Sequence, residues 1–233
     1  MNVLITGASK GIGRAIALNM AANGHDLALC ARNVKDLELL RNQILNLYPD
    51  RKVFIKVTDC SIKSEVLEFA AFSMSSLGSI EVLVNNVGVF TPFRILEEDD
   101  DALEAHMKAN VYSAYYLYKK IAPQMKERGN GYIFNICSVA SIETIVNAGT
   151  YCVTKSALLS LNNIMREELM DGQVKVTAIL PGSTLTSSWD GSSISPDKFI
   201  QPEDVALVIE QIMKMSNGAN VDQILIKPLH GQF

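Results

Sequence analysis

The chain begins with a short apolar run that passes through a glycine-rich turn into a helical pattern. Residues 2–6 are too few for anything but a buried strand, and a helical periodicity follows over residues 11–23. Between them stand Gly7, Gly11 and Gly13, which let the backbone turn tightly and approach a ligand closely. A helix start offers free N–H groups and a favourable dipole to an anion, so this segment predicts a site for a dinucleotide diphosphate. An ordinary flexible turn is the alternative, which three glycines at this spacing disfavour.

Apolar runs alternate with helical patterns along the rest of the chain. Such alternation predicts a parallel sheet that is covered by helices on both faces. The sequence shows no internal repeat and no linker. Further strands are expected near residues 26–30, 52–57, 81–85, 131–136, 174–179 and 222–226, and further helices near 34–47, 62–77, 98–127, 149–170 and 202–216.

Composition excludes several classes of protein. A net charge of −4 argues against a nucleic-acid surface, and no apolar stretch reaches the ~18 residues that a membrane span needs. Because the first residues form the first strand, they leave no room for a signal peptide. The cysteines have no metal-ligand spacing, so we expect no metal site and reduced thiols in a cytoplasmic protein. They are Cys30, Cys60, Cys137 and Cys152.

A tyrosine and a lysine, Tyr151 and Lys155, stand one helical turn apart in the pattern over 149–170. A lysine ammonium beside a tyrosine favours the charged phenolate, so the pair can donate and accept a proton near neutral pH. Ser138, thirteen residues before the tyrosine, is placed to hold the oxygen that receives the proton. As alternatives, such pairs arise often by chance on amphipathic helices, and a polar residue such as Ser138 can simply end the fifth strand. The glycine-rich turn at the start of the chain favours the catalytic interpretation.

Six motifs in this order and spacing resemble the short-chain dehydrogenase/reductase family, in its 3-oxoacyl-[acyl-carrier-protein] reductase-like or sepiapterin reductase-like branch. The resemblance covers nearly the whole chain. It implies a single-domain α/β Rossmann fold over residues 1–233, with a doubly wound, seven-stranded parallel sheet and helices on both faces. Val87 and Thr184 depart from the family pattern, which usually has alanine and a β-branched apolar residue there. The motifs are Thr6-Gly7-x3-Gly11-x-Gly13, Asn85-Asn86-Val87-Gly88, Asn110, Ser138, Tyr151-x3-Lys155 and Pro181-Gly182.

The resemblance implies a catalytic set of Asn110, Ser138, Tyr151 and Lys155. Ser138 would bind the carbonyl oxygen, Tyr151 would protonate it, and Lys155 would also bind the nicotinamide ribose. Asn110 would hold a water that relays protons through Lys155. Without the other three residues, Asn110 would be interpreted as a neutral residue inside the long helix over 98–127, although asparagine is a poor helix former.

The residues that follow the second strand predict the cofactor. An NAD site usually carries a carboxylate there to bind the ribose hydroxyls, but this chain has Arg32 instead, with Lys10 in the glycine turn. Two cations suit the 2′-phosphate of NADP(H), and arginine can grip it with two hydrogen bonds. Each residue taken alone could be a solvated surface cation. Together, with the carboxylate missing, they favour NADP(H).

The remaining cofactor contacts follow from the resemblance. Asp59 either binds the adenine amino group or caps the helix that begins near Ile62. Asn86 and Gly88 would contact the adenosine side, and Pro181 and Gly182 the nicotinamide. The full expected set is Gly7, Ser9, Lys10, Gly11, Ile12, Gly13, Arg32, Asp59, Asn86, Gly88, Tyr151, Lys155, Pro181, Gly182, Thr184 and Thr186.

Two stretches differ in composition from the rest of the chain. Residues 97–101 are acidic, and we expect them to stay solvated in the first turn of a helix. Residues from about 183 to 200 are rich in serine, threonine and glycine and follow the sixth strand, where ligands bind in such folds. A plain surface loop is possible, but the resemblance favours a mobile substrate lid.

The substrate is predicted only by class, as a small-molecule or acyl-thioester carbonyl. The 3-oxoacyl-[acyl-carrier-protein] reductase-like activity has as alternatives a sepiapterin- or diketone-type carbonyl reductase and a small hydroxy-acid dehydrogenase. A non-catalytic NADP-binding regulator is the alternative from another class. The resemblance further implies a homotetramer or homodimer built on the helices over 98–127 and 149–170. Candidate pocket residues are Val89, Phe90, Val139, Ile145, Trp189 and Ile194.

Overall fold

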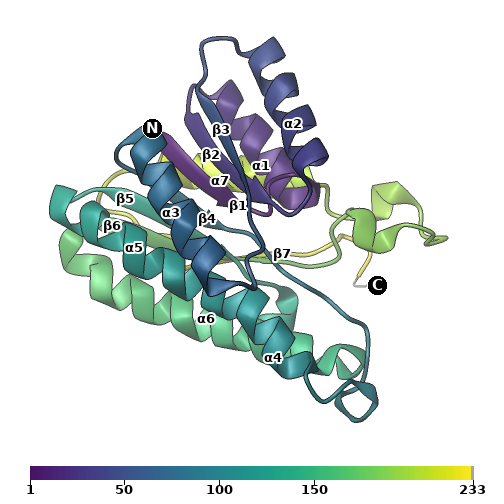
Figure 1. Cartoon of the computed structure of the whole chain (residues 1–233). Coiled ribbons are helices and arrows are strands. Elements are labelled where there is room, and N and C mark those ends of the chain that lie inside the picture. The colour runs from purple at the N-terminus through teal and green to yellow at the C-terminus, as the bar shows by residue number, and fades with distance from the viewer. Residues whose placement is uncertain (232–233) are drawn as a thin grey trace.

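All seven expected strands form, and they lie side by side in one parallel sheet in the computed structural model, which describes residues 1–231 (Figure 1). The strand order is β3-β2-β1-β4-β5-β6-β7, so the chain winds outward in one direction and then crosses back to wind in the other. This confirms the doubly wound Rossmann fold. The strands are β1 (Asn2–Thr6), β2 (Asp26–Ala31), β3 (Val53–Val57), β4 (Val82–Asn85), β5 (Gly131–Ile136), β6 (Val174–Pro181) and β7 (Gln223–Ile226).

Helices cover both faces of the sheet because successive strand residues point to opposite sides. Leu27 and Leu29 of β2 pack into one hydrophobic cluster, whereas Ala28 and Cys30 pack into the other. On the first face lie α1 (Gly11–Ala22), α2 (Val34–Leu47) and α7 (Pro202–Met213), and on the second lie α3 (Lys63–Leu77), α5 (Ser113–Arg128) and α6 (Gly149–Leu169) (Figure 1).

The helix expected over residues 98–127 forms without a gap, but it starts later than expected and contains a π-helical turn. It consists of α4 (Ala102–Met107), the π-helical turn η2 (Lys108–Tyr112) and then α5. The long helix is therefore confirmed, and the π-helical turn was not predicted. Short 3₁₀ turns lie at Ile95–Glu97, Val139–Ser141, Val146–Ala148, Met170–Gly172, Ser187–Trp189 and Pro196–Lys198.

The acidic run over residues 97–101 precedes α4 instead of forming its first turn. Glu98 is partly buried, and its carboxylate accepts a hydrogen bond from the hydroxyl of Thr150, at the start of α6. The expectation that this whole run stays solvated was wrong for Glu98. Its carboxylate ties the loop after β4 to the helix that carries Tyr151.

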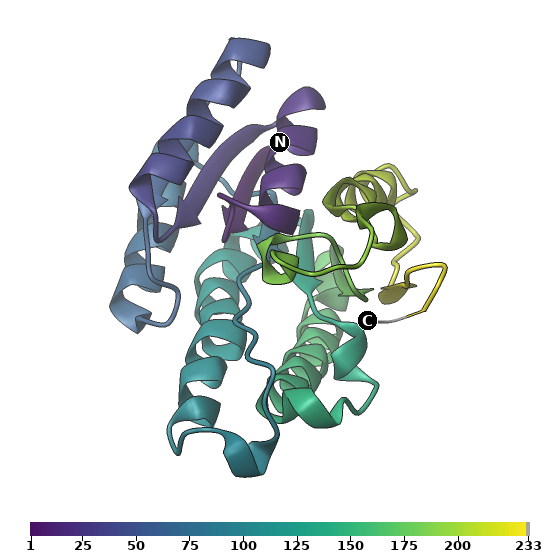
Figure 2. The same cartoon turned by 90° about the vertical axis from the view of Figure 1, so that its right-hand side faces the viewer.

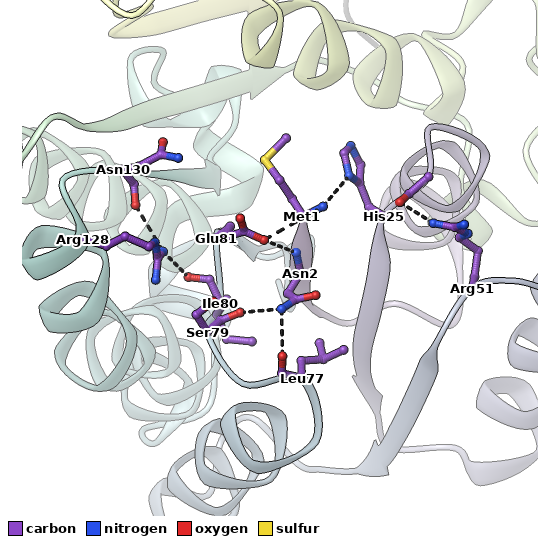
Figure 3. Close-up of polar contacts among 11 residues, drawn as sticks. Met1, Asn2, His25, Arg51, Leu77, Ser79, Ile80, Glu81, Arg128 and Asn130 are labelled. Atoms are coloured by element: carbon purple, nitrogen blue, oxygen red, sulfur yellow. Dashed lines mark hydrogen bonds and ion pairs between the residues drawn. The ribbon is translucent and has the colours of Figure 1, made fainter.

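A polar network fixes the edge of the sheet where the strands begin (Figure 3). The Glu81 carboxylate accepts from the backbone N–H of Asn2 at 2.7 Å and lies 4.0 Å from the amino group of Met1. That amino group also lies 3.3 Å from Nδ1 of His25, and burial, with the charge of the amino terminus, lowers the pKa of this histidine. These contacts hold β1 in register between β2 and β4. They lie opposite to the edge where the strands end and the loops follow.

The segment over residues 183–200 lies at that opposite edge, where the strands end (Figure 2, light green). Its two ends are joined by a parallel bridge between Thr184 and Ile200, with Leu185 N donating to Ile200 O at 2.8 Å. The segment is therefore a loop whose two ends are hydrogen-bonded to each other. Whether it moves as a lid stays a prediction. Within residues 1–231, no helix combines the length and apolarity needed to cross a membrane.

Candidate functional site

A cleft of about 870 Å³ lies along the edge of the sheet where the strands end. It runs from the glycine turn past the ends of β2, β3 and β4 to the segment after β6, which is where ligands bind in open α/β sheets. Its size lies within the range of small-molecule sites. It brings together most of the expected cofactor residues, namely Gly7, Ser9, Lys10, Gly11, Ile12, Arg32, Asp59, Asn86, Gly88 and Thr186.

The three glycines of the turn have different roles. Gly7 and Gly11 have φ angles of +62° and +50°, a conformation that side chains disfavour. Gly13 does not line the cleft, and a Cβ there would lie 2.3 Å from the carbonyl oxygen of Gly7. It is needed so that α1 can start directly against the turn. Gly13 therefore has a packing role, and its contact with the cofactor stays a prediction.

Asn86 braces the glycine turn from the end of β4. Its amide nitrogen donates to the carbonyl oxygens of Thr6 and Gly7, at 2.9 and 3.1 Å. In return, the hydroxyl of Thr6 accepts from the backbone N–H groups of Asn86 and Val87, at 3.0 and 3.2 Å. Thr6 therefore positions the site, a role that the sequence analysis missed although it quoted the residue within a motif.

The cationic end of the cleft contains a carboxylate that the sequence analysis did not anticipate. Lys10 and Arg32 both line the cleft, but Lys10 Nζ lies 3.2 Å from Oδ2 of Asp36, in the first turn of α2. Asn33, which caps α2, accepts from the backbone N–H of Asp36 and holds it there. Arg32 is thus the more available cation.

Asp59 follows β3 and also lines the cleft. It does not cap α3, because its Oδ1 accepts instead from the backbone N–H and the hydroxyl of Ser61, at 2.9 and 2.7 Å. Burial opposes the charged form, but these two hydrogen bonds and the charge of Arg32 outweigh it and lower the pKa of Asp59. Its charged carboxylate is suited to accept a hydrogen bond from an amino group. The contact with the adenine amino group stays a prediction.

Tyr151, Lys155 and Gly88 lie close together beside the cleft. Lys155 is only 3% exposed, its Nζ donates to the carbonyl oxygen of Ile136 at 2.8 Å, and it lies 5.7 Å from the centre of the Tyr151 ring. A Cβ added to Gly88 would lie 3.2 Å from that same Nζ. The lack of a side chain at Gly88 therefore opens the cleft to the lysine ammonium.

Ser138 is buried at the start of the short turn over residues 139–141. Its hydroxyl oxygen accepts from the backbone N–H of Ala140 at 3.1 Å, and its own N–H donates to Ser141 Oγ at 3.3 Å. A serine hydroxyl has one hydrogen and two lone pairs, so accepting this bond leaves the hydrogen for a ligand.

Asn110 lies in the π-helical turn and is 1% exposed. Its Oδ1 accepts from the N–H of Val89 at 2.7 Å, and its amide nitrogen donates to Val89 O and to Thr154 Oγ1, both at 3.0 Å. Both amide hydrogens are therefore used within the protein. The water relay through Asn110 stays a prediction, but the side chain has no hydrogen left for that water.

The expected pocket residues are only partly brought together. Val89 lines the cleft. Phe90 does not, but its ring meets the Tyr151 ring in a T-shaped contact with centroids 5.0 Å apart. Trp189 instead packs on Phe199, with ring centroids 4.9 Å apart. Over the part of the chain that the structure describes, the lining of the cleft does not include Val139, Ile145, Trp189 or Ile194.

Cys137 precedes Ser138 in the sequence and is buried. Burial raises the pKa of its thiol to about 11, against the opposing charge of Lys155. We therefore expect iodoacetamide at pH 8 to modify the partly exposed Cys152 and to spare Cys137 until the protein is denatured, because the thiolate is the reactive form. Peptide mass spectrometry would measure this, and rapid native labelling of Cys137 would contradict it.

A comparison with protein families places residues 1–194 under a model described as short chain dehydrogenase. An uncharacterized oxidoreductase of Staphylococcus aureus (strain MW2) is 27% identical over 226 residues, which cover 97% of this chain and 96% of that protein. In residues 1–231, no group of three or more His, Cys, Asp or Glu residues is arranged to hold a metal ion.

Two solved structures resemble this one closely. An alcohol dehydrogenase from the archaeon Thermococcus sibiricus, complexed with 5-hydroxy-NADP, matches with a TM-score of 0.90 and 26% identity, covering 100% of this chain and 98% of the other. The L-sorbose reductase of Gluconobacter frateurii, complexed with NADPH and L-sorbose, matches with a TM-score of 0.89 and 25% identity, covering 100% and 96%.

Proposed function

The chain belongs to the short-chain dehydrogenase family, and from this premise we propose that it is an NADP(H)-dependent oxidoreductase that interconverts a carbonyl and an alcohol. The observation that carries the proposal is the grouping of Tyr151, Lys155 and Gly88 beside a cleft of dinucleotide size. The similar proteins complexed with NADP-type cofactors, including the archaeal alcohol dehydrogenase, support the choice of cofactor.

The residues of the cleft fit such a cofactor. The start of α1 after Gly7 and Gly11 would take the diphosphate, since it offers N–H groups to an anion without intervening side chains. Arg32 would hold the 2′-phosphate, and Asp59 would accept from the adenine amino group. Pro181 ends β6, and with Gly182 and Thr184, which follow it, would face the nicotinamide. Thr186 lies beside Gly11 and would close over the diphosphate.

The cofactor, when bound, supplies the hydride that a carbonyl carbon accepts. The chain itself orients the carbonyl and handles the proton. Ser138 donates its free hydroxyl hydrogen to the carbonyl oxygen, and the Tyr151 phenol donates the proton that this oxygen gains. The Lys155 ammonium, held in place by Ile136 O, stabilises the negative charge left on the phenol oxygen.

The residues near Tyr151 favour one kind of group on the substrate. Phe90 lies against Tyr151, and Val89 lines the cleft, so an apolar group beside the carbonyl would be favoured. We propose a 3-oxoacyl-thioester reductase-like activity first. A reductase of diketones or pterins and a small hydroxy-acid dehydrogenase are kept as alternatives. The four free thiols support a reducing compartment such as the cytoplasm.

The test is the loss of NADPH absorbance with a panel of 3-oxoacyl thioesters, diketones, ketoses, pterins and 2-oxo acids. Turnover on one class identifies the substrate. A protein that binds NADPH but turns over no member of the panel would instead support a non-catalytic regulator. The Tyr151→Phe variant serves as the control for non-enzymatic NADPH loss.

We also propose that the protein is a homotetramer or homodimer. On the two helices expected at the interface, the apolar residues Leu158 and Met165 are buried within the chain, whereas Tyr112 and Tyr115 are exposed. Ile164 on α6 is 55% exposed as well, so both helices carry exposed apolar residues that a second copy could cover. Light scattering at micromolar concentration should give a dimer or tetramer mass, and Ile164→Asp should lower it. A monomer mass for the parent protein would contradict the proposal.

A further inference from the structure

Thr154 lies in the helical turn that carries Tyr151 and Lys155, but it is not one of the residues that the sequence predicted to be catalytic. It lies between Tyr151 and Lys155 on α6 and is 0% exposed. Its hydroxyl donates to the carbonyl oxygen of Tyr151 at 3.0 Å and accepts from the amide nitrogen of Asn110, also at 3.0 Å. The hydroxyl therefore uses its hydrogen and one lone pair to join two elements.

Beyond Asn110, the same network reaches the loop that follows β4. The amide of Asn110 makes two hydrogen bonds to the backbone of Val89, at 2.7 and 3.0 Å. The residue before Val89 is Gly88, where an added Cβ would lie 3.2 Å from Lys155 Nζ and 4.0 Å from Asn110 Oδ1. A continuous hydrogen-bonded path thus runs from the Tyr151 backbone through the buried side chains of Thr154 and Asn110 to the wall of the cleft.

A role in helix stability alone does not explain this arrangement. Threonine is a poor helix former, and its hydroxyl often bonds a carbonyl one turn back in ordinary helices. The contact with Asn110 is different, because it crosses to another element and occupies an amide hydrogen that is buried from water. A valine at this position would fill the same volume but leave that hydrogen without an acceptor.

We propose that Thr154 is a positioning residue that sets the Tyr151–Lys155 turn relative to the cleft wall at Gly88 and Val89. This inference rests on the proposed function. In this proposal, the Asn110 side chain links α6 to the loop that follows β4. Because a misplacement of about 1 Å can cost ~10²-fold in rate, a small shift of this turn should be visible in kcat.

The experiment compares Thr154→Val, Thr154→Ser and a matched control, Ser73→Ala. Ser73 is equally buried and its hydroxyl also bonds a carbonyl one turn back, Phe69 O at 2.8 Å, but on α3 away from the cleft. We expect Thr154→Val to lower kcat by ~10-fold or more at unchanged NADPH affinity, and Thr154→Ser to restore it. Ser73→Ala should lower the melting temperature and leave kcat unchanged.

A second measurement keeps the inference testable whatever the substrate is. The ionisation of Tyr151 can be isolated as the ultraviolet difference between each protein and its Tyr151→Phe counterpart. The pH midpoint of this ionisation should differ from that of the parent protein in Thr154→Val, and should equal it in Thr154→Ser. If no carbonyl is reduced by the parent protein, the proposed function fails and this titration alone decides the inference.

Two results would overturn the role of Thr154. One is a Thr154→Val protein that is less stable but keeps the parent kcat and the parent midpoint, which is what a purely structural residue would give. The other is a Thr154→Ser protein as impaired as Thr154→Val. If Thr154→Val does not fold, Thr154→Ala takes its place, because the smaller side chain removes the hydroxyl without steric demand.

Discussion

Replacing Tyr151 by phenylalanine should lower turnover by ~10²-fold or more and leave NADPH binding unchanged. The change removes the only transferable proton on this side chain but keeps the ring, which packs edge-on against Phe90 and lies beside Lys155. The cleft residues that would hold the phosphates lie elsewhere, at the glycine turn and Arg32. Steady-state kcat and a fluorescence titration with NADPH would measure the two effects separately.

Tyr132→Phe is the matched control for this prediction. The Tyr132 hydroxyl donates to the carbonyl oxygen of Met213 at 3.2 Å, outside the cleft, so its loss should cost some stability and no turnover. A Tyr151→Phe enzyme with near-normal kcat would show that another group donates the proton. Loss of NADPH binding in that variant would instead mean that the ring orders the cleft.

The parent protein should prefer NADPH to NADH by ~10-fold or more in kcat/KM, since ~1.4 kcal/mol corresponds to a factor of ten. A charge-assisted hydrogen bond from Arg32 to the 2′-phosphate is worth roughly 1.5–3 kcal/mol, less where solvent screens it. The Ala31→Asp, Arg32→Ala double variant should reverse the preference. Its new carboxylate would repel the phosphate and accept hydrogen bonds from the ribose of NADH. Equal use of both cofactors by the parent would contradict the role of Arg32.

Asp36→Asn separates the contributions of the two cations. In the parent, Asp36 holds Lys10 at 3.2 Å and reduces the charge available to the phosphate. Removing that carboxylate should therefore strengthen the preference for NADPH, in the opposite direction to the double variant. An unchanged preference would mean that Lys10 stays clear of the phosphate even when it is unpaired.

The sequence was sufficient to predict the sheet and its cofactor edge. The central strands of this parallel sheet are buried on both faces, so they appear as uninterrupted apolar runs such as Val3-Leu4-Ile5. Gly7 and Gly11 meet a backbone requirement, because a positive φ angle limits the residue type at that position. These signals are local, since a short window of residues contains all the physics that sets them.

The partners of the polar side chains were decided only by the tertiary structure. Asn110 lies in a π-helical turn and its amide binds Val89, 21 residues away along the chain, and Glu98 makes a partly buried contact with Thr150. Likewise, Lys10 pairs with Asp36 only because α2 begins beside the glycine turn. Such contacts depend on where distant segments meet, and helical periodicity carries no record of that. The sequence therefore determined which residues could do chemistry, and packing between elements decided which of them hold one another in place.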